Sequence, residues 1–220
     1  MSQKGKTANL ELILECEIRD KNGKLISIHR QPSKSLLKNF ARMLRTMLNN
    51  AIPTGTINSS VTLKDVNGAS NPFYGAYASS GTLTYGSGLA PLCALAPQYN
   101  DTYGIQVGAA AVSVDRDQYA LSGKIPNGSS AGQLTYGSMT VEDTDGTPPD
   151  TVFRLIRPFT NNTTGDVTVW EIGLAIANVY NNGGTFYNNN FLIARDVLSP
   201  PQTIPAGATL TVRYIFKVTA

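Results

Sequence analysis

Alternation of side chains at the end of the chain constrains the fold more than any other feature of the sequence. From Leu210 to Val218 every second residue is apolar, and three of the four residues between them are polar. Successive side chains of a strand leave the backbone on opposite sides, so this segment is predicted to be a strand with one buried face. The region from Val152 to Val218 as a whole predicts four consecutive strands, and we find in it no set of residues suited to catalysis.

Similar strand patterns occur along most of the chain, with turn-forming Gly, Pro, Asn and Asp residues between them. Besides the last strand, they are predicted at 10–19, 24–30, 105–107, 119–125, 133–141, 151–159, 167–177 and 191–198. Because no helical pattern connects neighbouring strands, the sheets should be antiparallel. The predicted fold is therefore mainly β: an antiparallel β-sandwich, jelly-roll-like, with an N-terminal β-hairpin and one amphipathic helix.

Residues 1–50 form the first predicted unit, a β-hairpin followed by the helix, which packs on or docks to a sandwich domain of residues 51–220. Asn22 and Gly23 are a residue pair preferred in two-residue hairpin turns. The helix is predicted from Lys34 to about Asn49, with Ser33 as its N-cap. Two stripes recur at helical spacing. The apolar stripe is Leu36, Leu37, Phe40, Leu44, Met47 and Leu48, and the basic stripe is Lys34, Lys38, Arg42 and Arg45.

The basic stripe contributes to a net charge of +6 for residues 1–50, against −3 for the rest of the chain. It is a candidate surface for phosphate groups or an acidic protein, although such a stripe is more often the solvated face of a helix. The imbalance is too small to predict a nucleic-acid-binding protein. No apolar run approaches the roughly 18 residues of a membrane-spanning helix, so membrane insertion is not expected.

The segment from about 66 to 100 contains no charged residue and is rich in Gly, Ser and Tyr. We expect an insertion of short strands and turns that lies over the core. The alternative is a contact surface for other subunits or a receptor, because Tyr contributes a large contact area at a small entropic cost. The interface candidates in this segment are Phe73, Tyr74, Tyr77, Tyr85 and Tyr99.

Catalytic and metal-binding patterns are weak throughout the sequence. The single histidine, His29, lies in a predicted hairpin strand without a nucleophile motif elsewhere in the chain. Acidic pairs such as Glu142 with Asp143 lie in predicted turns, where carboxylates usually bind backbone amides. Cys16 falls on an apolar strand face and is expected to be buried, while its pairing with Cys93 stays open. We therefore expect no enzyme and no cofactor.

Glu171 lies inside a predicted strand that is largely apolar on both faces. A carboxylate buried there is costly unless a cation pairs with it. We interpret Glu171 as half of a structural ion pair, because several arginines lie in strands that could neighbour it. The candidate partners are Arg154, Arg157, Arg195 and Arg213.

Three motifs in the last third of the chain occur in an order that resembles a known class of proteins. They are Glu171-Ile172-Gly173-Leu174, then Leu192-Ile193-Ala194-Arg195-Asp196, then Pro205-Ala206-Gly207 followed by Leu210, Val212 and Tyr214. This order is similar to the C-terminal part of structural proteins from tailed bacteriophages and related prokaryotic viruses. The segments Ile105–Gly108, Asp117–Leu121 and Asp20–Lys24, and the start of the helix, are also similar to such proteins. Together the motifs touch about two thirds of the chain, without the uncharged segment.

The resemblance implies a virion component without enzymatic activity, such as a capsid decoration or a tail or neck appendage. Its partners would be copies of itself, plausibly in a trimer, and other virion structural proteins. An alternative from a different class is an attachment module that binds a carbohydrate or receptor on the host surface through exposed aromatic residues. In either case the expected location is the virion.

Overall fold

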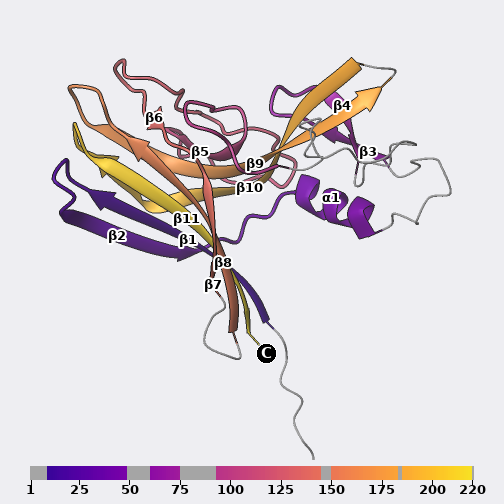
Figure 1. Cartoon of the computed structure of the whole chain (residues 1–220), viewed down its shortest axis with the longest axis horizontal. Coiled ribbons are helices and arrows are strands. Elements are labelled where there is room, and N and C mark those ends of the chain that lie inside the picture. Colours follow the sequence, from indigo (N-terminus) through magenta and orange to yellow (C-terminus); the bar gives the residue numbers. More distant parts are fainter. Residues whose placement is uncertain (1–8, 49–59, 75–92, 145–149, 183–184, 220) are drawn as a thin grey trace, which may run out of the picture.

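The computed structural model describes residues 9–48, 60–74, 93–144, 150–182 and 185–219 (Figure 1). These residues are mainly β, with antiparallel sheets and one helix, as the sequence predicts. The six-stranded sheet contains β2 (Leu25–Pro32), β1 (Asn9–Arg19), β11 (Thr209–Thr219), β8 (Asp150–Thr160) and β6 (Thr135–Tyr136), with β7 (Thr140–Thr144) also on β8. The three-stranded sheet is β10 (Thr185–Ile204), β9 (Val167–Asn182) and β5 (Gly104–Gly108). A hairpin of β3 (Ser60–Lys64) and β4 (Ser70–Tyr74) and the helix α1 (Lys38–Leu48) complete the described elements.

The two larger sheets pack against each other and enclose the main core. Leu14 and Val212 of the six-stranded sheet and Ile172 of β9 are fully buried in one cluster. The hydroxyl of Tyr214 crosses between the sheets and donates to the carbonyl of Ile172 at 3.4 Å. The mainly β class with antiparallel sheets is confirmed, whereas the β-sandwich and its jelly-roll form stay predictions. The four strands predicted between Val152 and Val218 are confirmed as β8, β9, β10 and β11.

The N-terminal hairpin is part of the main sheet. Its turn forms because the Asp20 carboxylate accepts the N–H groups of Asn22 (2.8 Å) and Lys24 (2.9 Å), and Gly23 has a φ of +82°. On its other side β1 pairs with β11 from Asn9↔Thr219 to Arg19↔Thr209. The first and last described strands are therefore neighbours, and β1 does not form a separate sheet of residues 1–50.

The helix begins four residues later than predicted, because the preceding segment pairs with a sheet edge. The N–H of Leu37 donates to the carbonyl of Ile193 at 2.9 Å, and the N–H of Arg195 donates to the carbonyl of Ser35 at 3.1 Å. Ser33 is not an N-cap, since its hydroxyl donates to Asp196. Lys34 therefore lies outside the helix.

The helix also buries a different face from the predicted one. Asn39, Met43 and Thr46 are buried, whereas Leu44, Met47 and Leu48 of the apolar stripe are exposed. The Asn39 amide determines this rotation, because it donates to the carbonyls of Lys64 in β3 (3.1 Å) and Leu192 in β10 (3.2 Å). A polar side chain with two backbone acceptors thus takes the position expected for an apolar one.

At one end the six-stranded sheet continues beyond the three-stranded sheet as a narrow four-stranded extension (Figure 1). We define the extension as residues 9–13, 140–144, 150–155 and 215–219, which belong to β1, β7, β8 and β11. The described C-terminal end of the chain lies at its tip. The helix and the β3–β4 hairpin lie at a different end, beside the β9–β10 hairpin.

Candidate assembly surface

The extension presents apolar side chains on the face that continues the core side of the sheet. Strand register places Leu10 beside Val218, Leu12 beside Phe216, and Phe216 beside Phe153. The Phe153 and Phe216 rings stack with centroids 4.4 Å apart. Exposed fractions are 65% for Leu10, 43% for Val218, 39% for Phe153 and 47% for Val141. We call these side chains the apolar face of the extension: Leu10, Leu12, Val141, Phe153, Phe216 and Val218. One charged residue, Asp143 of β7, lies on the same side opposite Phe153, at the edge of the face.

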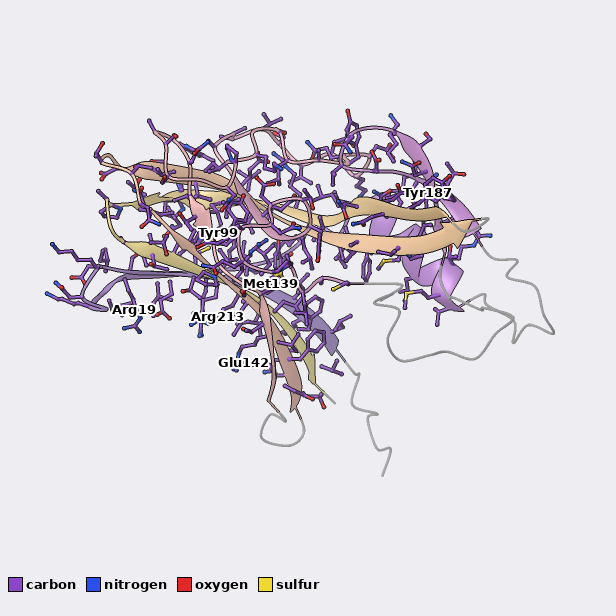
Figure 2. The ribbon with its side chains drawn as sticks, turned by 45° about the horizontal axis from the view of Figure 1, so that its top comes forward. Arg19, Tyr99, Met139, Glu142, Tyr187 and Arg213 are labelled. Carbon is purple, nitrogen blue, oxygen red and sulfur yellow. The ribbon has the colours of Figure 1, made fainter. Side chains whose placement is uncertain are left out.

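The opposite face of the same sheet carries ion pairs beside the body, and in the extension it also holds Ile13 and Ile215. Arg213 in β11 donates to Glu15 (2.9 Å) and Glu17 (3.0 Å) of β1. Arg30 also pairs with Glu15, and Arg19 pairs with Glu17. Figure 2 shows Arg19 and Arg213 along one side of the molecule, with Glu142 at the start of the extension. Charged residues of this kind are typical of a surface in contact with water. The exposed apolar side chains of the extension lie on the other face.

The outer edges of the extension have no neighbouring strand among the described residues at residues 9–11 of β1 and along β7. β2 pairs with β1 from Ile13 onward, and the N–H of Ser33 donates to the carbonyl of Leu12 at 2.8 Å. On the other side β7 pairs with β8. Because the four strands alternate in direction, β1 and β7 run antiparallel to each other. The two free edges are therefore matched in direction for antiparallel pairing between copies.

Glu171 forms its ion pair with Arg195, one of the arginines considered from the sequence. Arg195 Nε donates to Glu171 Oε2 at 2.5 Å, and both side chains are fully buried. Arg154 and Arg213 are not its partners, because they belong to β8 and β11 and point to the polar face of the other sheet. Arg154 pairs instead with Glu142 at 3.4 Å.

The buried pair holds the loop 109–124, where the sequence predicts a strand at 119–125. The Glu171 carboxylate accepts the N–H groups of Ser122 (3.2 Å) and Gly123 (2.7 Å). Arg195 donates to the carbonyl of Val112 (2.8 Å) and to Gln118 Oε1 (2.9 Å). These bonds hold residues 112–122 outside any strand. Residues 123–125 do pair with the edge of β5, where the N–H of Ile125 donates to the carbonyl of Val107 at 2.9 Å, so the strand predicted at 119–125 is present only at its end. The pair is fully hydrogen-bonded, as a buried charge requires.

A second buried arginine, Arg157, has a role that the sequence analysis did not assign. It lies on the apolar face of β8 and is completely buried. It donates to five backbone carbonyls, those of Pro97, Asn100, Tyr103, Ile105 and Gly137. Burial lowers the pKa of Arg157 to about 10, so it stays charged at neutral pH. A sequence clue exists, because Arg157 interrupts the apolar alternation of Phe153, Leu155 and Phe159.

The aromatic interface candidates have different outcomes. Phe73 is fully buried and packs edge-on against Phe191 at 5.9 Å, so its assignment to an interface is wrong. Alternation along β4 turns its ring into the core. Tyr99 is 60% exposed, on a backbone with a φ of +66°. Tyr77, Tyr85 and the side chain of Tyr74 lie outside the described residues.

The basic stripe divides into two groups. Lys38 and Arg42 line a hollow together with Lys64 of β3 and Arg116 of the loop 109–124. Arg45 lies in the last turn of the helix and does not line this hollow. Lys34 lines a different hollow.

The hollow at Lys34 contains one acid, Asp196, among its lining residues. Asp196 is nearly buried and accepts hydrogen bonds from Ser33 (2.7 Å) and Tyr214 (3.2 Å). Burial raises the pKa of Asp196, although these hydrogen bonds oppose the shift. A glycosidase needs two carboxyl groups across its substrate, and this lining supplies one.

The remaining residues considered for catalysis or metal binding do not gather in one site within the described part of the chain. His29 hydrogen-bonds with Gln31 two residues away at 3.1 Å. Across the residues that the structure describes, no three His, Cys, Asp or Glu side chains gather as metal ligands would. Within the same residues no helix has the length and apolar character needed to cross a bilayer. Cys16 and Cys93 are both free thiols.

Comparison with protein-family models, with curated proteins and with solved structures finds no match. The surfaces described above are therefore the basis for a functional proposal, together with the order of motifs in the sequence.

Proposed function

We propose that this protein is a non-enzymatic structural component of a virus particle, in a capsid decoration or a tail or neck appendage. It would act by associating with copies of itself through the extension and by docking to other virion proteins. The main supporting observation is the apolar face of the extension, which no described part of the chain covers. The order of the sequence motifs supports the connection to virus particles.

A second copy of this chain is the occupant that best fits the apolar face. Residues 9–11 of β1 and the outer edge of β7 have no neighbouring strand among the described residues, and the two strands run antiparallel to each other. In a ring around an axis along the strands, β7 of one copy can pair with β1 of the next. Such pairing would satisfy both edges and turn every apolar face toward the axis.

The geometry of a ring also limits the number of copies. With four strands from each copy, two copies bring together eight strands and three copies bring together twelve. Barrels of about eight strands or more have room for side chains inside. The trimer expected from the resemblance is therefore compatible with a closed interior, in which Asp143 of each copy would add a charge among the apolar side chains.

The test is the mass of the assembled protein, measured by analytical ultracentrifugation on the full chain. Leu10→Ser combined with Val218→Ser should shift a cyclic oligomer to monomer, because it removes apolar contact area from every interface. The control is Ile26→Ser combined with Ile28→Ser, which changes two similarly exposed apolar residues of β2, outside the extension. This control should keep the oligomer.

A wild-type protein that is monomeric at high concentration would contradict the proposal. The same conclusion would follow if the Leu10 and Val218 changes left the mass unaltered. The location is tested separately by antibody labelling of purified virus particles, where absence of the protein would contradict the virion assignment but not self-association.

A further inference from the structure

The hollow beside the helix N-terminus gathers positive charge from three separate elements. It has a volume of about 360 Å³. The helix α1 contributes Lys38 and Arg42, β3 contributes Lys64, and the loop 109–124 contributes Arg116. Asp117 is the one acidic residue among the lining residues. Four cationic groups thus surround one carboxylate, which leaves an excess of positive charge.

The cations of the hollow are only partly neutralised by neighbours. Lys38 Nζ pairs with Asp117 Oδ1 at 2.8 Å. The ammonium of Lys64 lies 5.3 Å from the centre of the Tyr119 ring, a cation–π contact. The guanidinium groups of Arg42 and Arg116 have no hydrogen bond or ion pair to any residue that the structure describes. Two groups suited to bidentate binding of oxyanions are therefore available.

The direction of the pKa shift of Asp117 agrees with an excess of positive charge in the hollow. The hydrogen bond and charge of Lys38 lower the pKa of Asp117, and the charges of Arg42 and Lys64 lower it further. The first turn of α1 adds the positive end of the helix dipole. Lys38 and Asn39 are the first two residues of α1 and both line the hollow.

Buried contacts hold the three elements in place before any ligand binds. The Asn39 amide joins the helix to β3 and β10 through the carbonyls of Lys64 and Leu192. The N–H of Lys38 donates to the carbonyl of Arg116 at 3.0 Å. The loop that carries Arg116 is bound to Arg195 through Gln118. A preformed site of this kind loses little conformational entropy on binding.

We propose that this hollow is a binding site for an oxyanion group of the phosphate or sulfate class. Arg42 and Arg116 bind the anion directly, and Lys38 and Lys64 add charge at its sides. A free ion and an ester on a larger molecule present the same oxygens, and the experiment below distinguishes these two sources. The proposal does not depend on self-association through the extension.

The experiment is calorimetric titration of the full-length protein at low ionic strength with inorganic pyrophosphate. Dextran sulfate is titrated in parallel, with unsulfated dextran as its control, to distinguish a free anion from a polymer-borne one. Arg42→Gln and Arg116→Gln should each weaken binding roughly tenfold, because each removes charge-assisted hydrogen bonds. The matched control is Arg45→Gln, which removes the same charge from the same helix and should change affinity by less than about twofold.

Binding of pyrophosphate or of dextran sulfate that is lost in Arg42→Gln and kept in Arg45→Gln supports the site. Inorganic sulfate is titrated as the free counterpart of dextran sulfate, and tighter binding of dextran sulfate per sulfate group would assign a polymer as the source of the anion. Absence of heat with both probes at millimolar concentration would overturn the proposal. Equal weakening by Arg42→Gln and Arg45→Gln would also overturn it, since the attraction would then belong to overall charge.

Discussion

The body and the extension of the six-stranded sheet have the same alternation but different surroundings. On β1 the core-side residues change from fully buried at Leu14 and Cys16 to 65% exposed at Leu10. On β11 they change from fully buried at Tyr214 to 43% exposed at Val218. The difference is the second sheet, which covers the body and not the extension. Alternation therefore identifies which face of a strand is apolar, while it does not identify what covers that face.

The body and the extension also differ in the burial of their ion pairs. In the body, Glu171 and Arg195 are fully buried and hold the loop 109–124. In the extension, Glu142 and Arg154 form a longer pair whose side chains are 53% and 32% exposed. A charge that is removed from water is costly without its partner, so each buried charge is stabilised by the other. Water screens the attraction between the exposed charges, so that pair contributes little.

The largest expected effect comes from breaking the buried pair. Glu171→Ala should lower the free energy of unfolding by about 3–5 kcal/mol, because it leaves Arg195 charged and buried without a partner. Glu142→Ala, the matched change in the extension, should cost less than about 1 kcal/mol. Urea unfolding of both variants measures the difference. Equal destabilisation by the two variants would remove the distinction between body and extension.

A second prediction compares two leucines on one face of one strand. Leu14→Ala should cost about 2–5 kcal/mol, since it opens a cavity in a covered core. Leu10→Ala should change the free energy of unfolding of the monomer by no more than about 0.5 kcal/mol, because the side chain is already mostly exposed. Unfolding is measured at dilutions where ultracentrifugation finds no oligomer. A large loss for Leu10→Ala in the monomer would mean that the extension is covered within a single copy.

The features that could be predicted from the sequence are those determined by local pattern. Alternation located the last four strands, and Asn22-Gly23 located the hairpin turn. The mainly β, antiparallel class followed from the absence of helical patterns between strands. Cys16 was expected inside from its apolar neighbours, and it is fully buried.

The features that were missed depend on contacts between distant residues. The helix start depends on pairing of residues 35–37 with β10, and its rotation depends on the acceptors of Asn39. Of the strand predicted at 119–125, only residues 123–125 pair with β5, whereas the residues before them form a loop in which the Glu171 carboxylate accepts the N–H of Ser122. The hollow at Arg42 includes Lys64 and Arg116, which no helical spacing relates to the basic stripe. Charge and periodicity in one segment could not indicate these long-range partners.

The pH dependence of stability provides a smaller test of the covered body. Burial raises the pKa of Asp196, so the native state keeps its proton at pH values where the unfolded chain has released it. The free energy of unfolding should therefore fall as the pH rises from about 4, the unfolded pKa, through the raised native pKa. Asp196→Asn should reduce this fall, because its neutral amide does not titrate.

The measurement is urea unfolding of wild type and Asp196→Asn between pH 3 and pH 7. The variant should gain stability relative to wild type as the pH rises through this range. Parallel curves for the two proteins would mean that Asp196 titrates in the native state as it does in the unfolded chain. Asp117→Asn is the exposed comparison, and it should lose stability relative to wild type over the same range because its native pKa is lowered.

Thiol labelling tests the boundary between body and extension along β1 itself. Burial raises the pKa of Cys16 to about 12, so this thiol should resist modification in the native protein at pH 8, whereas the partly exposed Cys93 should react. Leu10→Cys adds a thiol on the same face of the same strand, six residues earlier. It should react readily in the monomer and slowly in the oligomer, because neighbouring copies then cover it. Peptide mass spectrometry distinguishes the three positions. Slow reaction of the thiol in Leu10→Cys at dilutions that give monomer would place the limit of the covered body beyond the start of β1.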